Sequence, residues 1–206
     1  MANTDHPQVY IVTPPDPELS IFPSRLDDVL DSHEIACVRL AMASRDTDRI
    51  ARAADAIREV CHSADVAVVI EDHVALAQRL GLDGVHLTDG ARSVRKARTA
   101  LGRDAIVGAF CRASRHDGMT AGEAGADYVS YGPVTDEGLG DGTLADHALF
   151  AWWSEMIELP VVAEGALSEQ AVRSLAPVTD FFAIGEEIWR EDDAAQALAT
   201  LKGAMA

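Results

Sequence analysis

The sequence is poor in lysine and cysteine, and both shortages restrict the chemistry that it can support. Only Lys96 and Lys202 occur in 206 residues, and neither follows a strand-like apolar run. We therefore do not expect a Schiff-base lysine of the kind that aldolases use. The three cysteines, Cys37, Cys61 and Cys111, lack metal-ligand spacing and leave one without a partner. This usage favours a reducing compartment.

Long hydrophobic runs and positive charge are also scarce. No apolar run approaches the roughly 20 residues of a membrane-spanning helix, and the first residues lack a signal-peptide layout. We therefore expect a cytoplasmic protein without a membrane partner. The 34 acidic residues outnumber the 17 lysines and arginines, giving a formal net charge of −17. Such a chain repels nucleic acid, so we expect a small-molecule ligand and leave a homodimer open.

Short apolar runs alternate with helical periodicity along the whole chain. The runs cover residues 9–13, 35–41, 66–70, 84–87, 105–110, 127–132, 160–164 and 180–185. Because they are continuous and rich in Val and Ile, we expect strands buried on both faces, as in a parallel sheet covered by helices. Helical segments such as 46–62 and 91–101 lie between them. The sequence predicts an α/β fold, a single (β/α)8 TIM barrel of eight parallel strands over residues 1–206, with a doubly wound open sheet as the competitor.

Three segments resemble one another and favour the barrel. The segments GLDGVHL (81–87), GADYVSYG (125–132) and VTDFFAIG (178–185) each place an aspartate just before a strand that follows a helix. Recurrence of this kind is typical of a fold built from repeated units.

Ionisable groups stop several strands abruptly. In IEDH (70–73), Glu71, Asp72 and His73 follow a buried run, and the next strand holds His86 and is followed by Asp89. The carboxyl ends of parallel strands meet at one end of a barrel, where active sites form. We therefore expect a shared end for the following six residues: Glu71, Asp72, His86, Tyr131, Glu164 and Glu186.

Several of these residues have a structural interpretation beside the functional one. His86 alternates with Val85 and Leu87, so it points into the barrel as a catalytic or a hydrogen-bonded core histidine. Asp72 and Asp89 are either metal ligands or helix N-caps.

The order of these motifs resembles a known family. The stretches IEDHVALAQRLGLDGVHL (70–87) and GEAGADYVSYGPV (122–134) carry the most specific part. They resemble thiamine phosphate synthase and the related TenI-like thiazole tautomerases, which are small TIM barrels. The resemblance implies a transferase of thiamine biosynthesis: a thiazole phosphate alcohol displaces pyrophosphate from a pyrimidine methyl diphosphate, with Mg²⁺ shielding the leaving group.

The sequence departs from the family pattern where pyrophosphate and metal would bind. The family's Gln-x-Arg-x-Lys motif corresponds here to Arg39, Ala41 and Ala43, so Arg39 is the one cation left as a catalytic candidate. Of the two metal carboxylates that the resemblance implies, one is kept at Asp72. The other falls on Ala91, with Asp89 as a nearby substitute, so we expect Mg²⁺ to bind weakly.

The phosphate-binding end departs as well. The resemblance assigns substrate contacts to Tyr131, Gly132, Glu164, Gly165, Gly185 and Glu186. Glu164 and Ala166 stand where the family prefers an apolar residue and glycine, and Glu186 stands where a serine would meet the phosphate. The loop 135–143 contains no basic residue. Carboxylates at ~4–6 Å from a phosphate oppose its binding by roughly a few kcal/mol.

Three hypotheses follow. The first is a family member whose phosphate and pyrophosphate sites have diverged, with Arg39 and His86 as catalytic candidates and the transferase activity kept in divergent form, altered or lost. The second is a tautomerase-like enzyme with His86 or His116 as proton carrier. The third is a non-catalytic barrel whose acidic mouth binds an uncharged or cationic small molecule or a protein. Whether Cys111, Arg112 or His116 takes part stays open, and Arg115 lies with Arg112 in the loop after the fifth apolar run.

Overall fold

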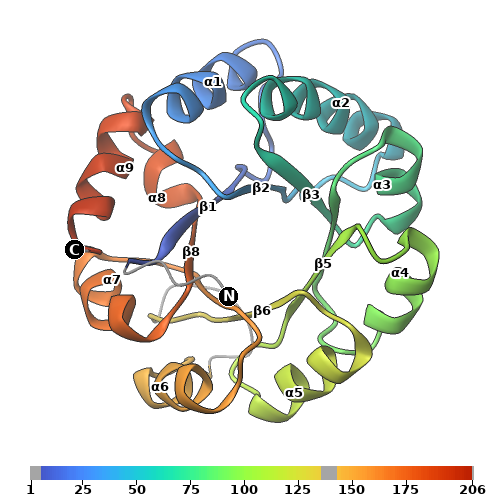
Figure 1. The fold of residues 1–206 in the computed structure, drawn as a ribbon. Helices are drawn as coiled ribbons and strands as arrows, with labels where there is room; N and C mark the ends of the chain where they lie inside the picture. The colour runs from blue at the N-terminus through green and yellow to red at the C-terminus, as the bar shows by residue number, and fades with distance from the viewer. Residues whose placement is uncertain (1–5, 136–142, 206) are drawn as a thin grey trace.

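Eight parallel strands close into a barrel in the order of the chain, β1 to β8. The structure is a computed structural model that describes residues 6–135 and 143–205. Seen along the barrel axis, the helices form a ring around the strands (Figure 1). Strand β8 pairs with β1 in parallel, which closes the sheet. The closed barrel confirms the TIM-barrel prediction and excludes the doubly wound open sheet.

Each predicted apolar run is a strand. The bounds are β1 Gln8–Val12, β2 Cys37–Leu40, β3 Ala67–Glu71, β4 Gly84–Leu87, β5 Ile106–Phe110, β6 Tyr128–Tyr131, β7 Val161–Glu164 and β8 Phe181–Ile184. The ends differ from the prediction by at most two residues. Because the six residues expected to share one end lie in the carboxyl-terminal half of a strand or within two residues after it, the structure confirms that expectation.

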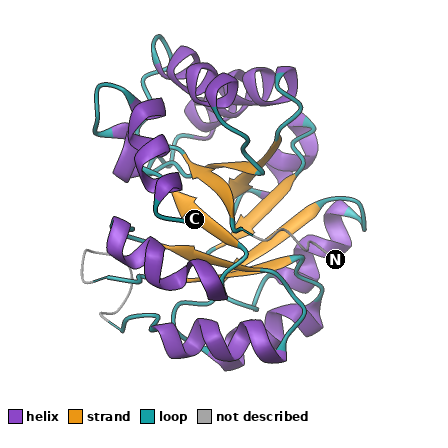
Figure 2. Ribbon diagram, turned by 60° about the vertical axis from the view of Figure 1, so that its left-hand side comes forward, coloured by secondary structure: helices purple, strands orange, loops and turns teal. Residues whose placement is uncertain are grey.

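The helices lie outside the strands, as the side view shows (Figure 2). They are α1 Phe22–Ser32, α2 Thr47–Ser63, α3 Val74–Leu80, α4 Val94–Leu101, α5 Arg115–Ala124, α6 His147–Met156, α7 Glu169–Leu175, α8 Glu186–Trp189 and α9 Ala194–Gly203, with a short 3-10 turn, η1, at Ala176–Val178. Helix α4 begins three residues later than predicted, because a turn precedes it. In the described part of the chain, no helix has the length and apolarity needed to cross a bilayer.

The recurring aspartates form hydrogen bonds between neighbouring strands in three places. Asp83, which precedes β4, accepts a hydrogen bond of 2.7 Å from the backbone N–H of Val68 in β3. Asp127 before β6 does the same for Val107 in β5 at 2.7 Å. Asp180 before β8 accepts from Val161 in β7 at 2.8 Å. The sequence repeat is therefore a structural device.

A chain of hydrogen bonds crosses the barrel interior. The hydroxyl groups of Tyr10 and Tyr128 lie 2.7 Å apart, and Nδ1 of His86 lies 2.9 Å from the Tyr128 hydroxyl. The His86 and Tyr128 rings stack with centroids 5.7 Å apart. Val69, Val162 and Ala183 pack with Tyr10 in the interior. The polar atoms of this layer are largely satisfied by each other, as a buried layer requires.

Replacing Asp180 with alanine should destabilise the barrel. The substitution leaves the buried N–H of Val161 without its charged acceptor, so the free energy of unfolding should fall by about 1.5–3 kcal/mol. Asp180→Asn is the matched control, because its amide oxygen still accepts the bond, and it should lose clearly less. Urea unfolding followed by circular dichroism measures both; equal losses would show that the hydrogen bond is not what stabilises this position.

Candidate functional site

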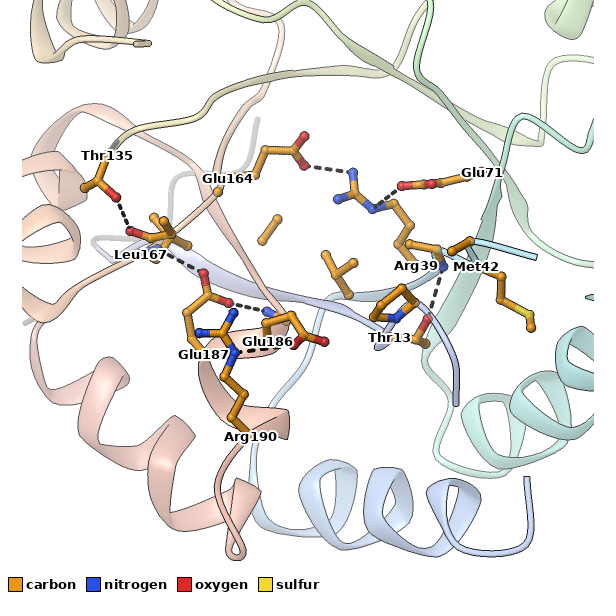
Figure 3. A pocket seen from close by; sticks show the side chains of 18 of the residues that line it. Thr13, Arg39, Met42, Glu71, Thr135, Glu164, Leu167, Glu186, Glu187 and Arg190 are labelled. Carbon is orange, nitrogen blue, oxygen red and sulfur yellow. Dashed lines mark hydrogen bonds and ion pairs between the residues drawn. The ribbon is translucent and has the colours of Figure 1, made fainter. Parts of the chain in front are cut away.

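A cavity of about 810 Å³ opens at the carboxyl ends of the strands. Residues from β1, β2, β3, β7 and β8 and the loops after them line it (Figure 3). Among the charged lining residues there are two arginines and four glutamates: Arg39, Arg190, Glu71, Glu164, Glu186 and Glu187. The cavity is therefore net acidic.

Arg39 lies at the centre of a buried charge cluster. Its Nη1 is 2.8 Å from Oε2 of Glu164, and its Nε is 3.4 Å from Oε1 of Glu71. Arg39 is 6% exposed and Glu164 is 4% exposed. The guanidinium carbon also lies 5.6 Å from the ring centroid of Tyr10, a cation–π contact. Neither ion pair has hydrogen-bond alignment, so the cluster is held mainly by charge.

The charges of this cluster shift one another's ionisation. Burial alone disfavours the charged form of Arg39, but Glu164, Tyr10 and Glu71 outweigh it and raise the pKa of the guanidinium. For Glu71, burial is the largest cause and raises the pKa of the carboxyl; the attraction of Arg39 only partly opposes this. Arg39 is thus a permanent cation whose charge two side chains of the protein already compensate.

The loops after β7 and β8 are joined by Glu187. Its Oε1 accepts a hydrogen bond of 2.9 Å from the backbone N–H of Leu167, and its Oε2 accepts one of 2.8 Å from that of Gly185. Figure 3 shows the Glu187 side chain reaching across to Leu167. The indole N–H of Trp189, in the same helix, donates to the carbonyl oxygen of Val12 in β1 at 2.7 Å. These bonds fix helix α8 against the mouth.

The loop after β7 has an unusual backbone. Gly165 has φ of 89° and Ala166 has φ of 53°, both in the left-handed region. An alanine in this conformation is strained by about 1–2 kcal/mol. The Thr135 hydroxyl donates to the carbonyl oxygen of Ala166 at 2.7 Å, which helps to hold the turn.

The family model for thiamine monophosphate synthase matches residues 9–187, which span the barrel and this mouth. The chain belongs to the thiamine monophosphate synthase family. It is 38% identical to the thiamine-phosphate synthase of Rhodospirillum centenum over 184 residues, covering 88% of this chain and 89% of the relative. It is also 38% identical to that of Erythrobacter litoralis over 202 residues, covering 95% and 94%.

A solved structure shows the same fold. The thiamine phosphate pyrophosphorylase of Pyrococcus furiosus superposes with a TM-score of 0.83 at 20% identity, over 96% of this chain and 95% of that one. At this identity the superposition supports the barrel architecture alone. Membership of the family places the chain in thiamine biosynthesis.

Four of the six predicted substrate contacts line the cavity of this family member: Glu164, Gly165, Gly185 and Glu186. Tyr131 does not, because its ring packs against Phe150 and Trp153 at centroid distances of 5.9 and 5.3 Å, on the helix side of β6. Gly132 is not a lining residue either. A side chain at Gly132 would meet the carbonyl oxygen of Glu164 at 2.2 Å, so glycine permits close strand packing there.

His86 lies inside the barrel without lining the cavity. It is 0% exposed, and burial, aided by the charge of Arg39, lowers the pKa of its imidazole well below the usual value. The neutral ring is bonded to Tyr128 through Nδ1, while Nε2 has no partner. The geometry favours the structural interpretation of His86, and its catalytic role stays a prediction.

The two candidate metal ligands, Asp72 and Asp89, both accept hydrogen bonds from hydroxyl groups of nearby residues. Both carboxylate oxygens of Asp72 accept hydrogen bonds from Thr88, one from its backbone N–H at 2.9 Å and one from its hydroxyl. Asp89 Oδ2 accepts from the Ser93 hydroxyl at 2.7 Å. Residues 6–135 and 143–205 contain no group of three or more His, Cys, Asp or Glu side chains that could hold a metal. Because Mg²⁺ is usually bound by one or two carboxylates together with substrate phosphates, weak Mg²⁺ binding at Asp72 and Asp89 stays a prediction.

The alternative interpretation of Asp72 as a helix N-cap is wrong. Helix α3 begins after His73 and has no side-chain cap, because the Asp72 carboxylate turns toward the neighbouring loop and binds Thr88. Asp72 itself has φ of 54°, a left-handed conformation that aspartate tolerates. For Asp89 the structure records only the Ser93 contact, and α4 has no side-chain cap either.

The remaining candidates lie away from the cavity. Burial raises the pKa of the Cys111 thiol to about 12, so it is not an activated nucleophile. Arg115 lies over the Trp152 ring, with 4.7 Å from its guanidinium carbon to the ring centroid. His116, in α5, and Arg112 are exposed and do not line the cavity. Within the loop 135–143, which contains no basic residue, positions 136–142 fall outside the described residues.

Sequence reasoning missed Glu187. The resemblance points to Glu186, which stands at the position of the family's serine, yet the next residue is the one that binds the two loops. The only signal was the paired Glu186–Glu187 directly after Gly185. Sequence alone does not reveal which of two adjacent carboxylates turns toward the loop of β7.

Removing Arg39 alone should be strongly destabilising. Arg39→Ala leaves Glu164 as an unpaired buried charge, and the free energy of unfolding should fall by about 3–5 kcal/mol. Arg39→Met combined with Glu164→Ile should stay near the natural stability or exceed it, because replacement of a buried ion pair by hydrophobic side chains of similar volume is often neutral or stabilising.

Denaturant unfolding of Arg39→Met, Glu164→Ile and the double variant measures this coupling. Arg190→Ala is the control: its 3.4 Å ion pair with Glu186 is exposed, so it should change stability by at most about 1 kcal/mol. Additive effects of Arg39 and Glu164 would contradict the buried pair.

Glu71 should make stability depend on pH in a defined direction. Its pKa is raised on folding above the ordinary value of 4.5, so the folded chain holds this proton to higher pH than the unfolded chain. The contribution of Glu71 to stability therefore falls as pH rises from about 4 through the folded pKa. Urea unfolding at several pH values should show Glu71→Gln gaining stability over the natural chain as pH rises, and the opposite slope would refute it.

Proposed function

We propose that this family member does not carry out the usual pyrophosphate-displacing transfer and that its acidic mouth takes an uncharged or cationic small molecule. The observation that carries the proposal is the position of Arg39. The one deeply buried cation among the described lining residues is already paired with Glu164 and Glu71.

The transfer reaction needs free positive charge at the mouth. Negative charge grows on pyrophosphate as it leaves, and cations that are not otherwise engaged stabilise it. Here Ala41 and Ala43 stand at the family's Arg and Lys positions, and the other lining cation, Arg190, lies 3.4 Å from Glu186. Neither described cation of the cavity is available without breaking an ion pair.

Recruiting Arg39 for a phosphate would be costly. The guanidinium would have to turn from Glu164, and an unpaired buried carboxylate costs about 3–5 kcal/mol. At about 1.4 kcal/mol for each factor of ten, this weakens anion binding roughly 10² to 10³-fold or more. A neutral or cationic ligand requires no such rearrangement.

The second candidate is the retained synthase reaction. The 38% identity to two curated thiamine-phosphate synthases over nearly the whole chain favours it. The two candidates differ in one measurable respect, since only a working synthase must bind pyrophosphate and release thiamine phosphate.

Titration calorimetry with pyrophosphate and Mg²⁺ separates these candidates. The natural chain should show no binding at micromolar concentrations and no thiamine phosphate from the two family substrates. Glu164→Ile/Glu186→Ser should bind pyrophosphate at least about tenfold more tightly, because it releases Arg39 and Arg190.

Glu186→Ser alone is the matched control, since it leaves the Arg39 pair intact and should recover only a small part of this gain. Micromolar binding or turnover by the natural chain would overturn the proposal. Because the natural chain is itself tested, the result does not depend on whether the double variant folds.

A further inference from the structure

Two backbone N–H groups at the mouth point to one carboxylate. Leu167 lies in the loop after β7 and Gly185 in the loop after β8, eighteen residues apart along the chain. Their N–H groups donate to the two oxygens of Glu187 at 2.9 and 2.8 Å. The carboxylate is thus bound in a bidentate manner by two loops, and all three residues line the cavity.

The place of these donors is informative. In TIM barrels a phosphate is frequently bound by backbone groups of the loops after strands seven and eight. A carboxylate resembles a phosphate in carrying negative charge and accepting hydrogen bonds on two oxygens. Here a side chain of the protein itself holds that position.

We infer that Glu187 is a specificity-determining residue: its carboxylate occupies the donors of Leu167 and Gly185 and excludes ligands that carry a phosphate monoester at this end. The inference rests on the proposed function and deepens it. The Arg39 cluster lies at the floor of the cavity, where the strands end, and Glu187 lies at its rim, between the loops after β7 and β8. The ligand class that fits is a small molecule whose end at this rim is a hydroxyl, an amine or another group without negative charge.

Two physical effects combine in this exclusion. A phosphate at the rim would find the two N–H donors already used, and it would lie beside the charge of Glu187. Expelling the carboxylate would leave it near Glu186, another carboxylate that lines the cavity. Like charges at this range oppose each other, so the displaced arrangement is disfavoured.

The test uses inorganic phosphate as the probe, measured by calorimetry. Glu187→Ala opens both donors and should bind phosphate at least about tenfold more tightly than the natural chain. Glu186→Ala removes the same charge from the neighbouring position and leaves the donors occupied, so it should bind clearly less tightly than Glu187→Ala. Equal gains in the two variants would overturn the inference, because the loss of charge alone would then explain the tighter phosphate binding. The absence of any gain in Glu187→Ala would overturn it as well.

A measurement on the natural chain guards against misfolding of the variant. In amide NMR spectra, millimolar phosphate should leave the Leu167 and Gly185 resonances unmoved, and a saturable shift of both would overturn the inference. Failure of the proposed function looks different. Pyrophosphate binding without movement of these two amides would refute the proposal on Arg39 and leave the inference on Glu187 standing.

Discussion

Arg39 and Glu164 meet inside the barrel mouth from strands that are not neighbours, β2 and β7. Each is almost fully removed from water, so each charge depends on the other for compensation. The rest of the mouth is arranged around this pair: Glu71 approaches from β3 and the ring of Tyr10 lies under the guanidinium. The same positive charge helps to keep His86 neutral in the interior.

The cations and the backbone N–H donors of the mouth are both bound by carboxylates of the protein itself. On the floor, side-chain cations are paired with glutamates; at the rim, backbone N–H groups are bonded to Glu187. A ligand that enters the mouth therefore meets carboxylates, while the cation and the N–H donors that bind those carboxylates are not free to bind the ligand. Binding energy in such a site must come from shape, apolar contact and hydrogen bonds to those acidic groups, since salt links with the protein's cations require broken pairs.

The sequence predicts the fold well because its signals are local. Burial of a strand or of one helix face can be recognised from a short stretch of residues. Examples are the apolar runs 66–70 and 84–87 and the two-faced segment 46–62. It predicts the site only in part, since the ends of strands can be located while partners across the barrel cannot. A buried arginine such as Arg39 requires an anionic partner, but only the closed barrel identifies Glu164 as that partner. The resemblance assigns a substrate contact to Tyr131, but its ring packs against Phe150 and Trp153, and the tyrosine of β6 that faces the interior is Tyr128.

Trp189 in helix α8 is an intrinsic fluorescence probe close to the mouth. Trp152 and Trp153 lie together in α6, whereas Trp189 lies in α8, with its indole bonded to β1 and its ring 4.8 Å from that of Phe22. Arg190, the next residue, and Glu187, two residues before Trp189, line the cavity. A ligand that displaces either of them moves charge close to this indole, so intrinsic fluorescence can follow occupation of the mouth without any label.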